Sequence, residues 1–257
     1  PLHVGRAAEN GILSAELAAL EFEAHPAALE GPKGFFYAFA GGFNPDKING
    51  KLGRPFSIVD PGVSIKPYPC GALGHPAMDA MRALVIQHDL HPEDVDYVKV
   101  ATGSNVLPPQ GPLRYRKAQT ALEGKFCLPF QMAAMIIRRK AGILEFTDEF
   151  VQNPAVQEMM DQVEPVIDPK IDALGRDKIV SRIEVRLKAG GILRGKSPEY
   201  YRGGPRSPLS REELAEKFND CVHRILNPDQ ATRLLEKIES LESLDDIRTL
   251  IEMASPP

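Results

Sequence analysis

The sequence of 257 residues predicts an α+β protein in which a mixed α/β region interrupts a helical one. Residues 6–23 and the segment after Ser210 carry apolar side chains at the spacing of an amphipathic helix. Residues 179–187 instead alternate apolar and polar side chains, as a half-buried strand does. Helices, then mixed elements, then helices again are typical of an α/β domain inserted into a helical one.

A change in pattern near residue 65 marks the expected domain boundary. Between Phe56 and Gly74, short apolar runs are separated by prolines, which suits strands and turns rather than a helix. We therefore expect a helical domain over 1–64, an α/β domain over 65–203 and a return to the helical domain over 204–257.

Local signals predict the individual elements. A short helix is expected over 34–42, where it ends in glycines. The α/β domain should contain a helix directly after His75, a strand over 94–102, a helix from near 121 to about 140 that kinks at Pro129, a helix over 154–164, and two strands joined at Gly190 and Gly191. Thr120 and Glu123 match a capping box, and so do Ser210 and Glu213, which should open the first of three C-terminal helices.

Composition and motifs exclude several classes of function. Hydrophobic residues make up 43% of the chain and charged residues 26%, and the formal net charge of -4 offers no basic surface for nucleic acid. No apolar run approaches the roughly 18 residues that span a bilayer, and no signal peptide is recognisable, so we expect a cytoplasmic protein without membrane contact. The three cysteines form no CxxC pair, and nucleotide, hydrolase and metal motifs do not occur, so we expect neither a disulfide nor a metal site.

The segment SIKPYPCGALGHPAMD, residues 64–79, is the strongest candidate for a functional site. His75, at the N-cap of a helix, should be held neutral by the helix dipole and can then act as a base. Lys66 adds a full positive charge, so the pair suits an anionic substrate. Pro67 and Pro69 stiffen the loop, and we expect both functional side chains to border one polar pocket. The same residues also fit a structural role, in which His75 only caps the helix and Lys66 lies in solvent.

A second helix start, near Thr120, places Lys125 close to a basic loop that contains Arg114, Arg116 and Lys117. This cluster fits either another anion site or an ordinary solvated surface.

The same SIKPYPCGALGHPAMDA segment resembles the Lys-Pro-Tyr-Pro-Cys and His-Pro-Ala motifs that mark the MmgE/PrpD family, which includes 2-methylcitrate dehydratase, cis-aconitate decarboxylase and iminodisuccinate epimerase. Further segments resemble that family in the same order along the chain: LHVGRAAENGILSAELAA, LEGPKGFFYAFAG, QTALEGKFCLPFQMAAMI and PLSREELAEKFND. The resemblance implies an all-helical domain, only part of which is present, with an α/β lid inserted into it and the active site between the two.

The resemblance also implies a cofactor-independent lyase for a small di- or tricarboxylate. Lys66 and His75 are the implied catalytic residues, although this chain has Gly71 where some relatives carry a histidine. The implied substrate-binding residues are Tyr68, Cys70, Gln119, Thr120 and Lys125.

The leading reaction is dehydration of a hydroxy acid that resembles 2-methylcitrate. The alternatives are an epimerase or decarboxylase of the same family, or a catalytically silent partner subunit. Because family members are longer and this chain starts directly in a helix, we expect a C-terminal portion, inactive alone, that requires the missing N-terminal helical half or a complementing chain. A homodimer is expected.

Overall fold

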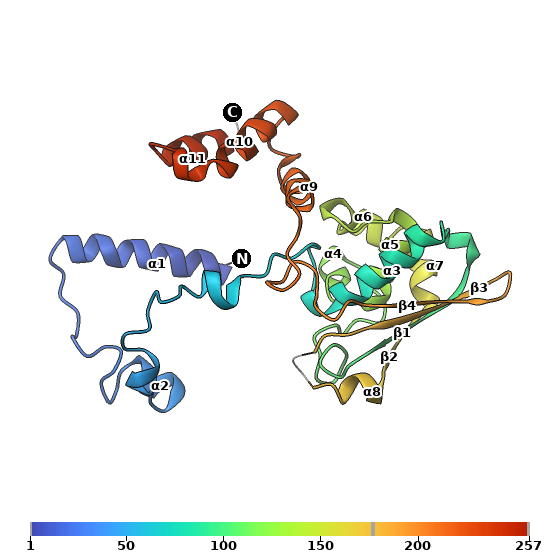
Figure 1. Ribbon diagram of the computed structural model, residues 1–257, viewed down its shortest axis with the longest axis horizontal. Coiled ribbons are helices and arrows are strands. Elements are labelled where there is room, and N and C mark those ends of the chain that lie inside the picture. Colours follow the sequence, from blue (N-terminus) through green and yellow to red (C-terminus); the bar gives the residue numbers. More distant parts are fainter. Residues whose placement is uncertain (1, 176–177, 256–257) are drawn as a thin grey trace. The chain divides into compact units, whose positions relative to one another are not determined.

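The computed structural model describes residues 2–175 and 178–255. The chain consists of two compact units, residues 1–60 and residues 61–257. Figure 1 labels the helices and strands of both.

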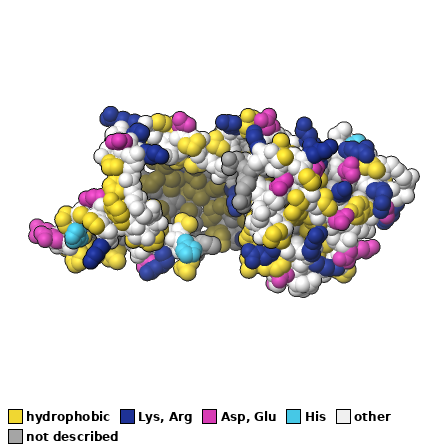
Figure 2. Space-filling view, turned by 90° about the horizontal axis from the view of Figure 1, so that it is seen from below, with side chains coloured by type: hydrophobic (Ala, Val, Ile, Leu, Met, Phe, Trp, Pro, Cys, Tyr) yellow, Lys and Arg dark blue, Asp and Glu magenta, His cyan; other side chains and the backbone are white. Residues whose placement is uncertain are grey.

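The unit formed by residues 1–60 is helical, as the sequence predicts. It contains α1 (Leu2–Ala19), α2 (Phe35–Ala40) and a short 3-10 helix (Pro45–Lys47). Gly41 ends α2 in the left-handed conformation that glycine adopts easily. None of the α1 side chains is buried, and large apolar residues such as Leu2, Val4 and Ile12 are more than half exposed. Figure 2 shows hydrophobic side chains at the surface of the molecule.

A four-stranded sheet forms the centre of the unit formed by residues 61–257. Its strands are β1 (Val95–Thr102), β2 (Val163–Ile167), β3 (Arg182–Leu187) and β4 (Ile192–Lys196), in the spatial order β2-β1-β3-β4. β1 pairs with β2 in parallel and with β3 in antiparallel orientation, and β3 and β4 form an antiparallel hairpin. Val98 of β1 lies opposite Val163 and Val185, so apolar side chains of three strands share one buried face.

Helices cover that buried face of the sheet. α3 (His75–Gln87) packs on β3 and β4, α5 (Leu128–Arg138) packs on α3 and β2, and α7 (Pro154–Asp161) packs on α5 (Figure 1). Shorter helices lie between them: α4 (Ala121–Gly124), α6 (Asp148–Val151) and α8 (Pro169–Asp172). Phe130 of α5 is fully buried and meets the rings of Phe146 and Phe150 edge to face. This core fixes the start of α3, where the candidate site begins.

Two predictions for this unit were wrong in detail. The helix expected over 121–140 is two helices, because the helical conformation is interrupted between Gly124, the end of α4, and Leu128, the start of α5. Pro129 lies in the first turn of α5, where its missing N–H has no helical partner to lose. The helix expected over 154–164 ends at Asp161, and the next residues form strand β2. Pro165 makes this segment unfavourable as a strand when judged from the sequence alone. The proline is tolerated because β2 is at the edge of the sheet.

The C-terminal part contains the three expected helices, α9 (Arg211–Val222), α10 (Pro228–Glu239) and α11 (Arg248–Ala254). The predicted capping box at α9 is confirmed, since Ser210 and Glu213 exchange both hydrogen bonds. A small second core joins these helices around Leu226, Ala231 and Leu234.

Candidate active site

The loop that precedes α3 has little regular structure of its own. After Pro67 and Pro69 comes a single 3-10 turn (Ala72–Gly74), and α3 begins immediately afterwards. His75 is therefore the first residue of the helix, and Gly74 is its N-cap, one position earlier than expected. A side chain at Gly74 would meet Gln131 Oε1 at 2.0 Å, so only glycine allows this close approach.

The carbonyl group of Lys125 anchors this loop to the segment that joins α4 and α5. It accepts hydrogen bonds from the Gly71 N–H at 2.8 Å and from Gln131 Nε2 at 3.2 Å. Lys125 is thus adjacent to the loop, and its charge acts on the Cys70 thiol. Of the residues expected to bind substrate, Lys125 is one that the fold brings to the candidate site.

Lys66 and His75 both contact the backbone of Cys70. Lys66 Nζ donates to the Cys70 carbonyl oxygen at 3.2 Å, and the His75 side chain is hydrogen-bonded to the same residue's backbone. Lys66 is exposed, whereas His75 is only 3% exposed. Nε2 of His75 is buried without a hydrogen-bond partner among the described residues. Such an orphaned polar atom is unusual in a folded protein, and a functional role is one explanation for it.

Electrostatics keep His75 neutral. Burial is the main reason that its pKa falls from 6.5 to about 4, and the positive charge of Lys66 lowers it further, with smaller effects of Arg202 and Lys217. The hydrogen bond to the Cys70 backbone opposes this change. The prediction of a neutral imidazole is therefore confirmed, with burial rather than the expected helix dipole as the main cause. The surrounding cations favour an anionic ligand.

Cys70 and Tyr68 are buried parts of the same loop. Burial raises the pKa of the Cys70 thiol to about 12, and its Sγ lies 3.6 Å from Met78 Sδ. The thiol is therefore protonated at neutral pH and is a poor nucleophile. Tyr68 packs edge to face against the His75 ring, with 5.3 Å between the ring centroids. Its hydroxyl donates to Asp79 Oδ1 at 2.7 Å, so it already has a partner inside the protein.

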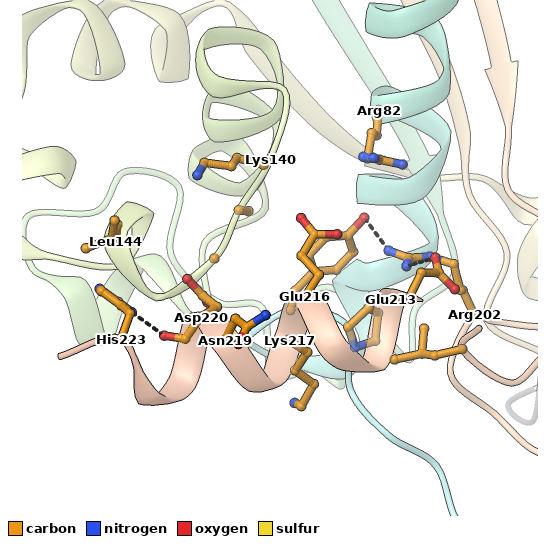
Figure 3. Close-up of a pocket in the computed structure, with 15 residues that line it drawn as sticks. Arg82, Lys140, Leu144, Arg202, Glu213, Glu216, Lys217, Asn219, Asp220 and His223 are labelled. Atoms are coloured by element: carbon orange, nitrogen blue, oxygen red, sulfur yellow. Dashed lines mark hydrogen bonds and ion pairs between the residues drawn. The ribbon is translucent and has the colours of Figure 1, made fainter. Parts of the chain in front are cut away.

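A polar cavity of about 350 Å³ lies beside this loop and is shown in Figure 3. Pro67 and Tyr68 line it, in place of the expected Lys66 and His75. Its other walls come from α3, from the residues after α5 and from α9, where Glu216 points towards Arg82 and Lys140 (Figure 3). This cavity is therefore not the expected pocket, and a pocket bordered by both functional side chains stays a prediction.

Gln119 and Thr120 lie elsewhere in the fold. The Thr120 hydroxyl accepts from the Glu123 N–H at 3.3 Å and caps α4. Gln119 contacts Gln157 of α7, at 3.3 Å between their side-chain amides. The Glu123 carboxylate bonds the N–H of Gln119, so the capping box expected with Thr120 is only half formed. The contacts of both residues are with α4, α6 and α7 rather than with Lys66 or His75.

The basic loop before α4 is partly neutralised. Lys117 forms an ion pair with Asp161 at 2.7 Å, and Arg116 donates to the Pro165 carbonyl at 3.4 Å. Arg114 and Arg116 line a separate hollow of about 350 Å³ along β2. The solvated-surface interpretation of this cluster fits these contacts better than a second anion site.

Sequence analysis missed Arg202, Asp79 and Lys217, which surround the loop. Arg202 contacts both Tyr68 and Asp79, and Lys217 Nζ donates to the Lys66 carbonyl at 2.8 Å. Arg202 and Lys217 are more than 130 residues from their partners in the loop, so no local pattern could have revealed these contacts. Within the described ranges, no group of three His, Cys, Asp or Glu side chains could hold a metal ion. No helix there combines the length and apolar character needed to cross a membrane.

Comparison with known proteins identifies the class to which this fold and loop belong. The MmgE/PrpD C-terminal domain matches residues 68–243, so the chain belongs to the MmgE/PrpD family. It is 29% identical over 267 residues to human cis-aconitate decarboxylase and 25% identical over 274 residues to the mouse protein of that name. Each match covers 100% of the chain but only 53% and 52% of these relatives. The chain therefore spans about half the length of the curated relatives it matches.

Proposed function

We propose that the chain supplies one side of the active site of a lyase that acts on a small di- or tricarboxylate. The observation that carries this proposal is the placement of Lys66 and His75 against the Cys70 backbone, with His75 Nε2 buried and without a partner among the described residues. A cation beside a neutral imidazole can hold a carboxylate and exchange a proton with the neighbouring carbon.

Lyase chemistry on such a substrate requires charge stabilisation. When CO2 or a proton leaves the carbon next to a carboxylated centre, the electron pair of the broken bond remains and spreads onto the adjacent carbonyl or carboxylate oxygens. Lys66 would stabilise that charge, and a preorganised donor of this kind contributes about 3 kcal/mol to transition-state stability. A polyanionic substrate would also raise the pKa of His75 from about 4 towards neutrality, so that the ring could return a proton to carbon.

Decarboxylation of cis-aconitate is the reaction that the relatives favour. Both matched relatives are named cis-aconitate decarboxylase. Their names therefore do not favour dehydration of a 2-methylcitrate-like acid over the family's other reactions. Dehydration stays a second candidate, because proton removal next to a carboxylate places the same demands on Lys66 and His75. Epimerisation also begins with that proton removal, and QTALEGKF resembles the branch of the family that contains the epimerase.

The remaining part of the site would come from a helical partner segment, either the N-terminal half of the same polypeptide or a complementing chain. The short match to the relatives and the exposed apolar side chains of residues 1–60 support this part of the proposal. In that arrangement residues 65–203 act as the lid, no cofactor takes part, and the complete protein is a homodimer.

The test is a substrate panel with the polypeptide expressed from the chain's own locus, together with any coding sequence that precedes Pro1. cis-Aconitate, 2-methylcitrate and an iminodisuccinate-type epimer are incubated with it in the presence and absence of EDTA. We expect EDTA-insensitive CO2 release from cis-aconitate. Turnover of only the hydroxy acid or the epimer would replace the reaction but keep the substrate class. Inactivity towards all three would favour the silent partner subunit.

A further inference from the structure

Arg202 joins three separate parts of the unit through one guanidinium group. Its Nε donates to Asp79 Oδ1 of α3 at 3.0 Å, its Nη2 donates to the Tyr68 hydroxyl at 2.9 Å, and its Nη1 donates to Glu213 of α9 at 2.6 Å. The Arg202 side chain is 25% exposed and that of Asp79 only 11%. Charge-assisted hydrogen bonds at this degree of burial are stronger and more directional than exposed ion pairs.

Tyr68 connects this cluster to the candidate site. It lies two residues after Lys66, and its ring packs edge to face against the His75 ring, with 5.3 Å between the ring centroids. The hydroxyl of Tyr68 donates to Asp79 and accepts from Arg202, so both of its usual hydrogen-bonding directions are occupied. This arrangement suits a residue that holds the loop in place better than one that binds substrate.

Residues 203–217 hold the other end of the loop. The N–H of Ile65 donates to the Gly203 carbonyl at 2.7 Å, and Lys217 Nζ donates to the Lys66 carbonyl at 2.8 Å. A side chain at Gly203 would lie 2.0 Å from the Ile65 carbonyl oxygen, so the two backbones approach as closely as glycine allows. The loop therefore takes its position from contacts with residues 202–217 as well as from its prolines.

We infer that Arg202 is a positioning residue, which acts through Tyr68 and Asp79 to hold Lys66 and His75 at their working separation. This inference rests on the proposed function of Lys66 and His75. A loop without regular hydrogen bonding needs such side-chain contacts, because a displacement of about 1 Å at a reacting group can lower the rate by about 100-fold. Arginine is required because its planar fork serves three acceptors at once, which the single ammonium group of lysine does not reproduce.

The test compares Arg202→Lys with Arg206→Lys in the polypeptide expressed from the chain's own locus. Arg206 lies in the same segment, is exposed and stacks on Tyr200, so Arg206→Lys removes a guanidinium group outside the cluster and serves as the matched control. We expect Arg202→Lys to lower kcat by at least tenfold with KM within about threefold of wild type, while Arg206→Lys leaves both unchanged. Tyr68→Phe keeps the ring on His75 and should lower kcat by about threefold to tenfold. The double variant should be no slower than Arg202→Lys, because the two residues act as one unit.

Four outcomes separate the possibilities. If Lys66→Met abolishes activity but Arg202→Lys keeps kcat within twofold of wild type, this inference is overturned and the proposed function stands. Independent, multiplicative losses in the double variant also overturn it, since they show that Arg202 does not act through Tyr68. If Arg202→Lys does not fold, an unchanged kcat in Tyr68→Phe overturns it. A wild type inactive on every substrate overturns the proposed function and this inference together.

Discussion

Replacing Lys66 by methionine removes the positive charge of the candidate site and keeps most of the side-chain stem. The lysine is exposed, and its side chain makes one described hydrogen bond, at 3.2 Å to the Cys70 carbonyl. Losing that bond should change the free energy of unfolding by about 1 kcal/mol or less. Losing an electrostatic donor in the transition state should cost about 3 kcal/mol, which lowers kcat/KM by about two orders of magnitude.

The assay measures steady-state turnover of cis-aconitate and the thermal midpoint for wild type, Lys66→Met and the control Lys170→Met. Lys170 is exposed on α8, and only its backbone N–H takes part in its hydrogen bond to Asp168. We expect a loss only in Lys66→Met. Its pH–rate profile should also move, because Lys66 is the strongest charge that lowers the pKa of His75, so its removal raises that pKa. Equal activity of the two variants would refute the reasoning, as would a collapse of the fold in Lys66→Met.

Three further predictions concern stability and reactivity. His75 has a folded-state pKa of about 4 against 6.5 when unfolded, so its contribution to stability is complete above pH 6.5 and is lost as the pH falls towards 4. Urea titrations should show that between pH 7 and pH 4 the free energy of unfolding falls by about 3 kcal/mol more in wild type than in His75→Gln. Equal decreases in the two proteins would contradict the burial of a neutral His75. Thiol titration with DTNB should show rapid reaction of the exposed Cys221, whereas the buried Cys70 and Cys127 should react only after unfolding. Burial raises the pKa of Cys70 and of Cys127 to about 12, which keeps both thiols protonated. A fast phase that remains in Cys221→Ser would disprove this prediction. Phe130→Ala should lower the free energy of unfolding in urea by about 3–5 kcal/mol because the ring is fully buried, and a loss below 1 kcal/mol would show that the site is loosely packed.

Local signals in the sequence were sufficient for much of the fold. The strand predicted over 179–187 begins only at Arg182, but the alternation correctly places Ile183 and Val185 on the buried face, with Arg182 and Arg186 exposed. Capping side chains marked the starts of α4 and α9 correctly, because they report on hydrogen bonds three residues away.

Interactions distant in the sequence were not predictable in this way. Strand β2 was missed because Pro165 is unfavourable in a strand unless the strand is at a sheet edge, and edge position depends on the assembled sheet. Lys66 and His75 could be grouped because a single loop carries both. The role of Arg202 depends on contacts with residues 68 and 79, which only the folded chain brings to it.

The most direct test of the account is a structure of the complete polypeptide with a tricarboxylate bound. We predict that one carboxylate lies within hydrogen-bonding distance of both Lys66 Nζ and His75 Nε2, the buried nitrogen that is now without a partner. A tricarboxylate bound only near Arg114 and Arg116, with Lys66 directed into bulk solvent, would contradict the assignment of the active site.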